Sequence, residues 1–104
     1  MELALQVFNH TEKLPSKEKF GLVSQMNRCA VSIPSNIAEG AGRNSNKDYR
    51  YFLSISLGSA FELETQLLLS QKLQYLKKED LSDTMNLIDE IQKMLNSLQN
   101  KLNT

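Results

Sequence analysis

A chain of 104 residues with 40% hydrophobic and 23% charged residues has the composition of one soluble globular domain, which argues against a disordered tail and a membrane protein. Twelve basic and twelve acidic residues give a formal net charge of zero. Because a dedicated nucleic-acid binder usually carries a clear basic excess, this balance argues against strong, non-specific DNA binding. It also lets copies of the chain approach without net repulsion.

The N-terminal residues and the cysteine content indicate a cytoplasmic protein. Residues 1–5 have no basic stretch, and no segment approaches the roughly 18 apolar residues of a membrane span. Cys29 is the only cysteine, so an intramolecular disulfide is impossible and an oxidising compartment is unnecessary. We therefore expect neither a targeting signal nor a membrane partner.

Apolar residues recur every three or four positions in four segments, which predicts helices and no strands. The first segment covers residues 2–13 and is ended by Pro15. The second covers 16–41, with Ser16 as its predicted N-cap. Pro34 lies inside it, and because the apolar period continues past this proline we expect a kink rather than a break.

The third helix is predicted over residues 47–75, with Ser45 and Asp48 spaced as in a capping box. Gly58 lies inside this segment, where glycine costs about 1 kcal/mol relative to alanine. We interpret it as a point where another backbone or side chain lies against the helix. Small residues in the third helix match a similar set in the second, so these two helices should approach closely: Ser54, Ser56, Gly58, Ser59 and Ala60 against Ala30, Ser32, Ser35, Ala38 and Ala41.

The fourth helix is predicted over residues 79–103, where leucine and isoleucine recur every seven residues at positions 81, 88, 95 and 102. Short connections favour an all-α, antiparallel up-and-down four-helix bundle, with residues 1–104 forming one domain. Leu87 and Met94 add more apolar surface than a monomer of four helices needs. This excess favours self-association.

The residue inventory argues against an enzyme and against a metal or other cofactor. His10 is the only histidine, and we expect it to be partly exposed at the end of the first helix. Cys29 has no histidine at a plausible distance, so we interpret it as a buried apolar residue rather than a nucleophile. Gly40 and Gly42 indicate a helix end rather than a phosphate-binding loop.

Charged and amide side chains have structural interpretations as well. Glu39 and Arg43 are spaced for an i,i+4 pair beside a solvated turn. Glu62, Glu64 and Gln66 lie in an apolar stretch, where we favour hydrogen bonds between helices over acid–base chemistry. An enzyme using Glu39, Glu62 and Arg43 is the least favoured alternative, and we expect no small-molecule substrate.

Residues 32–43 read Ser-Ile-Pro-Ser-Asn-Ile-Ala-Glu-Gly-Ala-Gly-Arg, and Ser45 and residues 47–49, 52–53, 58–60 and 62–67 follow them. With this run, nearly the whole chain resembles the bacterial four-helix-bundle family of proteins encoded in 23S rRNA intervening sequences. Its signature positions here are Ile33, Pro34, Ser35, Asn36, Ile37, Ala38, Glu39, Gly40, Gly42, Arg43, Gly58, Glu62, Glu64 and Gln66.

The resemblance implies a ring-like homopentamer without established enzymatic activity. A related branch, the accessory variability determinant of diversity-generating retroelements, is a similar pentamer that partners a reverse transcriptase and contacts nucleic acid through a basic surface. The zero net charge of this chain departs from that pattern.

Two functions remain open at this point. The first is an oligomeric scaffold that binds a protein or RNA partner. The alternative is an RNA-binding accessory protein, related to ribosomal RNA intervening sequences or to a nucleic-acid-processing protein such as a reverse transcriptase. Its candidate contacts are Lys17, Lys19, Arg28, Arg43, Lys47 and Arg50.

Overall fold

The computed structural model describes residues 1–103 and contains four α-helices and one short 3₁₀ turn. The elements are α1 (Glu2–Thr11), η1 (Ser16–Glu18), α2 (Leu22–Ala41), α3 (Asn46–Lys72) and α4 (Lys78–Lys101). No strand occurs within the described range. The predicted all-α class is therefore confirmed.

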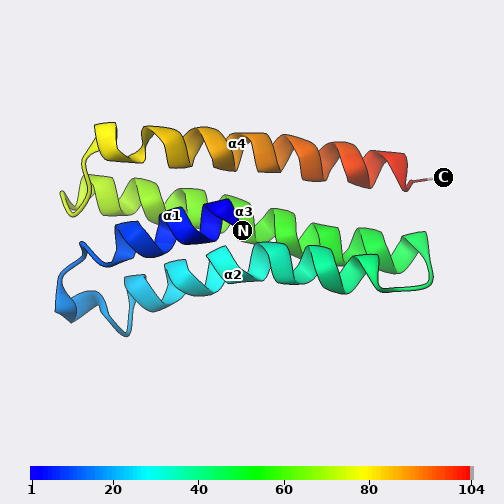
Figure 1. Cartoon of the computed structure of the whole chain (residues 1–104), viewed down its shortest axis with the longest axis horizontal. Coiled ribbons are helices and arrows are strands. Elements are labelled where there is room, and N and C mark those ends of the chain that lie inside the picture. Colours follow the sequence, from blue (N-terminus) through cyan, green and yellow to red (C-terminus); the bar gives the residue numbers. More distant parts are fainter. Residues whose placement is uncertain (104) are drawn as a thin grey trace.

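The four helices form an antiparallel up-and-down bundle with overall dimensions of 45 × 24 × 18 Å (Figure 1). Both α1 and α3 contact α2 and α4, so consecutive helices are neighbours around the bundle. The short α1 accompanies only part of the long helices, and the N-terminus lies near the middle of the molecule (Figure 1). One half of the bundle therefore consists of α2, α3 and α4 alone.

Apolar side chains from all four helices meet in one core. Val7, Met26, Leu63, Leu67 and Ile88 are fully buried there. The seven-residue repeat of α4 also supplies Leu81 to this core, and Leu95 of the same repeat is buried as well; each is 1% exposed. Burial of a side chain of this size stabilises the fold by about 1.5–3 kcal/mol.

The predicted boundary between the first two helices was wrong. The structure has a single 3₁₀ turn at Ser16–Glu18, and α2 begins only at Leu22. Gly21 precedes α2 with φ −109° and ψ −104°, outside the helical region, so the helix does not extend back to Ser16. Glu18 accepts a hydrogen bond of 2.8 Å from Tyr75 Oη, which ties η1 to the connection between α3 and α4.

The predictions for α3 were close at its start and too long at its end. Ser45 Oγ accepts the backbone N–H of Asp48 at 3.1 Å, which confirms the predicted N-cap. At the other end, Gln74 adopts φ 65° and the backbone N–H of Tyr75 turns back to Ser70 O at 3.0 Å. This left-handed residue ends α3 at Lys72 rather than residue 75.

Pro34 does not break α2, which is continuous from Leu22 to Ala41. Ser56 Oγ of α3 donates to Ile33 O at 2.9 Å, directly beside the proline. Ser32 and Ser59 form a second hydrogen bond of 2.9 Å between the same helices. The predicted close approach of small residues on α2 and α3 is therefore confirmed for Ser32, Ser56 and Ser59.

The close contact expected at Gly58 is absent from this chain, and Gly40 has that role instead. A Cβ atom on Gly58 would meet nothing within 4 Å, because the residue lies on the exposed side of α3. A Cβ on Gly40 would lie 2.9 Å from Phe52 Cβ and 2.9 Å from Tyr49 Cδ1. Glycine is thus required where the end of α2 crosses the start of α3.

Gly40→Ala is expected to destabilise the protein and Gly58→Ala to stabilise it. The added methyl at Gly40 overpacks the contact at a cost of about 1–3 kcal/mol, which exceeds the gain in helix propensity. At the open site of Gly58, the propensity gain of about 0.5–1 kcal/mol acts alone. Urea unfolding followed by circular dichroism measures both variants, and equal shifts of the same sign would contradict the assignment.

Candidate functional site

The six basic residues proposed from sequence do not form one surface. Lys17 and Lys19 lie in and beside η1, whereas Arg43, Lys47 and Arg50 lie at the connection between α2 and α3. These two connections are at opposite ends of the 45 Å bundle (Figure 1). The sixth residue, Arg28, belongs to the middle of α2.

Two of these arginines are engaged by neighbouring side chains. Arg43 pairs with Glu39 at 2.5 Å, as the i,i+4 spacing predicted, and its guanidinium carbon lies 4.9 Å from the centre of the Phe52 ring. Arg50 donates to Asn103 Oδ1, and its carbonyl accepts from Gln99 Nε2 at 3.2 Å. Arg50 thereby joins the start of α3 to the end of α4.

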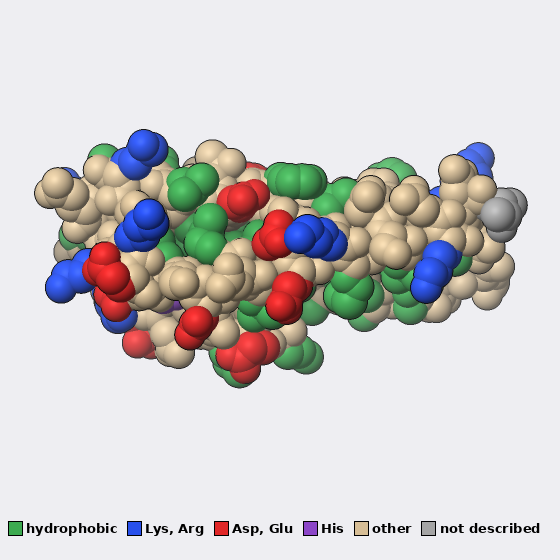
Figure 2. All heavy atoms as spheres, turned by 90° about the horizontal axis from the view of Figure 1, so that it is seen from above, with side chains coloured by type: hydrophobic (Ala, Val, Ile, Leu, Met, Phe, Trp, Pro, Cys, Tyr) green, Lys and Arg blue, Asp and Glu red, His purple; other side chains and the backbone are tan. Residues whose placement is uncertain are grey.

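The distribution of charged side chains over the surface agrees with the separation of the six basic residues. Figure 2, which views the molecule onto α4, shows acidic and basic side chains interspersed on that face, without one continuous basic area there. An exposed ion pair, Asp89–Lys93 at 3.0 Å, belongs to this helix. A surface of this kind does not concentrate positive potential for a phosphate backbone.

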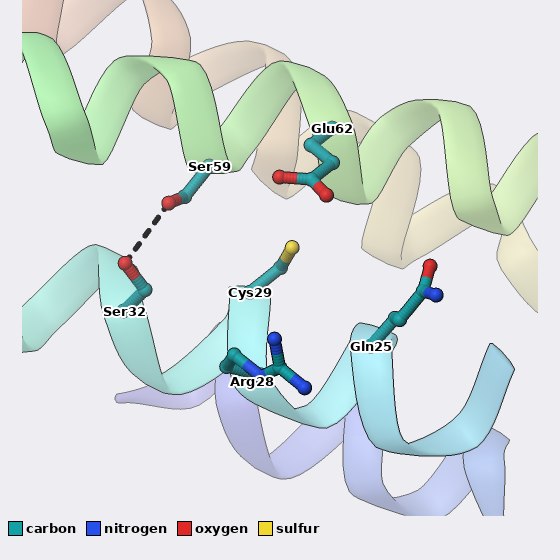
Figure 3. A pocket seen from close by; sticks show the side chains of 6 residues that line it. All are labelled: Gln25, Arg28, Cys29, Ser32, Ser59 and Glu62. Carbon is teal, nitrogen blue, oxygen red and sulfur yellow. Dashed lines mark hydrogen bonds between the residues drawn. The ribbon is translucent and has the colours of Figure 1, made fainter. Parts of the chain in front are cut away.

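A small cavity of about 140 Å³ lies between α2 and α3 and holds the single thiol. Its lining side chains are Gln25, Arg28, Cys29, Ser32, Ser59 and Glu62 (Figure 3). Burial, followed by the nearby Glu62 carboxylate, raises the pKa of Cys29 to about 11. At neutral pH the thiol is therefore protonated and a poor nucleophile.

Cys29 is buried, as the sequence predicted.

The sequence analysis predicted hydrogen bonds between helices for Glu62, Glu64 and Gln66 of α3, and one of these three residues forms one. Glu64 accepts from Gln92 Nε2 at 3.0 Å and so connects α3 to α4. Glu62 instead points toward Cys29 across the cavity (Figure 3). Gln66 is 6% exposed, and its Oε1 has no hydrogen-bond partner among the described residues.

The prediction that His10 is partly exposed was wrong. Its side chain is 8% exposed, and Nε2 lies 2.9 Å from Thr84 Oγ1 of α4. The end of α1 therefore faces α4 with its polar residues. Within residues 1–103, no group of three or more His, Cys, Asp or Glu side chains is arranged to hold a metal ion.

A larger, apolar hollow lies elsewhere, between α1 and the exposed side of α2, and we call it the α1–α2 groove. It measures about 460 Å³ and is lined by Met1, Ala4, Leu5, Phe8, Val31, Pro34, Ser35 and Ala38. Leu5 is 60% exposed and Val31 45%. Three of the family-signature positions, Pro34, Ser35 and Ala38, thus face outward into this groove.

Exposed apolar side chains also occur along the length of α3, and we call this set of residues the α3 stripe. Its exposed members are Tyr51, Ile55, Phe61, Leu68, Leu69 and Leu73. Phe61 is 51% exposed and Tyr51 63%. The sequence analysis assigned excess apolar surface to Leu87 and Met94 of α4, of which Met94 is 58% exposed, but it did not identify the groove or the stripe. The signal was present as leucine and aromatic residues outside the core-facing positions of each helix.

This geometry defines the class of protein: an antiparallel bundle of four helices with two exposed apolar surfaces. The chain belongs to the 23S rRNA-intervening sequence protein family, whose model matches residues 1–97. The family resemblance read from residues 32–43 is therefore confirmed. No curated protein matches the chain.

A solved structure supports the same assignment. The chain is similar to a protein of unknown function from the S23 ribosomal protein family of Bacteroides thetaiotaomicron, known from a 1.70 Å crystal structure. The two share 31% sequence identity and superpose with a TM-score of 0.86. The match covers 94% of this chain and 92% of the other. None of the helices in residues 1–103 has the length and hydropathy that crossing a bilayer requires.

Cys29 is expected to react slowly with a disulfide reagent such as Ellman's reagent. Raising the pKa from 9.0 to about 11 lowers the thiolate fraction at pH 7.5 by about a hundredfold, and burial slows access further. The rate in the folded protein is compared with the rate in urea, where the thiol is free. A folded-state rate within tenfold of the unfolded one would show that the cavity does not suppress ionisation.

Proposed function

We propose that this protein is a non-enzymatic homo-oligomeric scaffold, a homopentamer as its family resemblance implies, that binds a protein or RNA partner. The observation that carries the proposal is the pair of exposed apolar surfaces, the α1–α2 groove and the α3 stripe. Contiguous apolar patches on soluble proteins mark interaction sites more often than chance exposure. The buried thiol and the two engaged arginines offer no competing reactive centre.

The two surfaces differ in shape and lie on different helices, which favours a particular mode of assembly. The groove is concave and formed by two helices, whereas the residues of the stripe all belong to a single helix. When two different patches of one chain meet, the contact is heterologous and repeats from copy to copy until a ring closes. The zero formal net charge opposes this association less than a large single-sign charge does.

The size of the surfaces also favours multiple contacts. Stable interfaces use about 20–30 residues on each side. The groove is lined by eight residues, and the stripe has six exposed apolar members. Neither surface alone has the extent of a strong dimer interface, but each chain in a ring uses both. A protein or RNA partner then meets several equivalent surfaces at once.

Light scattering coupled to gel filtration at micromolar concentration tests the assembly, and a multiple of the 11.8 kDa chain mass is expected. Leu5→Asp in the groove and Phe61→Asp in the stripe each place a charge in an apolar contact, so each should shift the protein toward the monomer. Asn86→Asp on α4, outside both surfaces, is the matched control. A monomeric parent protein would reject the proposal.

One observation supports the alternative RNA-binding function. The hydrogen bond between Tyr75 and Glu18 holds η1 beside the α3–α4 connection. Lys17 and Lys19 therefore share one end of the bundle with Lys77 and Lys78, and all four side chains are exposed. If RNA binds this chain, we expect this end to contact it rather than the six basic residues together.

RNA binding at this end would depend on salt. Fluorescence anisotropy with a single-stranded RNA should show affinity that falls as salt rises, with a slope set by the number of phosphates contacted. Lys17→Glu combined with Lys19→Glu should weaken binding at least tenfold, whereas Lys93→Glu on α4 should change it little. Absence of binding at low salt would remove the alternative and leave the scaffold proposal standing.

A further inference from the structure

The contact between the end of α1 and α4 is a directed chain of hydrogen bonds. His10 Nε2 lies 2.9 Å from Thr84 Oγ1, and Thr84 Oγ1 donates to Gln6 Oε1 at 2.6 Å. Gln6 Nε2 in turn donates to Glu2 Oε2 at 3.0 Å. His10 and Thr84 are 8% and 1% exposed, so water has little access to this contact.

The chemistry of these groups fixes which atom of His10 carries the proton. The Gln6 amide nitrogen faces a carboxylate, so its oxygen is the atom that accepts from Thr84. A hydroxyl has one proton, and the Thr84 hydroxyl uses it in the hydrogen bond that it donates to Gln6. His10 must therefore donate through Nε2–H, and in the neutral ring this leaves Nδ1 without a proton. Its Nδ1 is then a buried acceptor, with no hydrogen-bond partner among the described residues.

Protonation of His10 would disrupt this arrangement. The imidazolium carries a second N–H at Nδ1, where no described residue accepts it, and a buried charge without a partner is costly. The charged groups nearby act in opposite directions. Lys13 of α1 disfavours the charged ring and Asp80 of α4 favours it, while Asp83 of α4 lines the same cavity of about 270 Å³. From α2, the uncharged Asn27 binds the adjacent Thr11 at 3.0 Å.

We propose that His10 and Thr84 form a pH-sensitive latch that holds α1 on α4 more strongly while the imidazole is neutral than when it is protonated. The ten residues of α1 are too few for a helix to be stable alone, so α1 depends on its contacts with α2 and α4. Losing the α4 contact loosens the whole segment. Burial, and then Lys13, lower the pKa of His10 below its ordinary 6.5, in agreement with the geometry.

The direction of the pH effect follows from this. Above pH 6.5 the imidazole is neutral whether α1 is docked or released, and docking is at full strength. As pH falls below 6.5, the released segment takes up a proton that the docked segment resists. The opening equilibrium of α1 therefore rises by up to about tenfold for each pH unit, until the pKa of the docked state is reached.

Release of α1 also has a consequence for assembly, and this step alone rests on the proposed scaffold function. Met1, Ala4, Leu5 and Phe8 form one wall of the α1–α2 groove. Opening of the latch removes that wall, so self-association through the groove should weaken between pH 7.5 and pH 5. The latch itself depends only on contacts within one chain.

NMR on the full chain tests the latch. His10 is the only histidine, so one imidazole signal reports its titration, which should have a midpoint below 6.5. Hydrogen-exchange protection of α1 amides, corrected for intrinsic rates, should fall by up to about tenfold per pH unit below 6.5, with α3 amides as the internal reference. His10→Gln, which keeps an N–H donor but does not titrate, should remove this pH dependence.

The outcomes separate the two proposals. A midpoint at or above 6.5, α1 protection that does not change with pH, or an equal pH response in His10→Gln would each overturn the latch. If that variant does not fold, the wild-type titration and exchange still decide. Assembly that weakens at pH 5 in the wild type alone supports the link to the groove. A chain that is monomeric at every pH removes the scaffold function and leaves the latch intact.

Discussion

The packing of α2 against α3 is the contact on which the rest of the bundle depends. At one end of the seam, Gly40 lets α2 approach Tyr49 and Phe52 at a distance that a side chain would prevent. In the middle, the Ser56 hydroxyl binds the carbonyl of Ile33, next to the proline that leaves α2 one backbone donor short. Small residues thus allow two long helices to lie close, and the hydroxyl groups of Ser32, Ser56 and Ser59 are paired across the contact.

The contact between α2 and α3 also explains why residues 32–43 have one buried side and one exposed side. Ile33 and Gly40 are buried, and Asn36 donates to Ser32 O at 2.8 Å and to Ser32 Oγ at 3.0 Å. The other side of the same two helical turns carries Pro34, Ser35 and Ala38 into the α1–α2 groove. One short run of sequence therefore serves the interior through one face and an exposed apolar surface through the other.

Much of the fold could be predicted from the sequence, because its signals are local. The seven-residue repeat of α4 and the Ser45 cap of α3 each depend on neighbouring residues, and both were confirmed. The start of α2 was wrong because Ser16 resembles a helix cap, although the backbone at Gly21 interrupts the helix. No local pattern distinguishes a capping serine from one that opens a 3₁₀ turn.

The candidate site was harder to predict from the sequence because it depends on which face each helix turns toward its neighbours. His10 was expected at the surface, yet α1 turns it toward Thr84, 74 residues away in the chain. The sequence also contained two helical glycines without indicating which one meets a neighbour, and the structure assigns that role to Gly40. The same rotation leaves Leu5 and Phe61 outside the core. Apolar side chains that a well-packed interior holds outward stay in contact with water, which is the physical reason for seeking the function of this bundle on its surface.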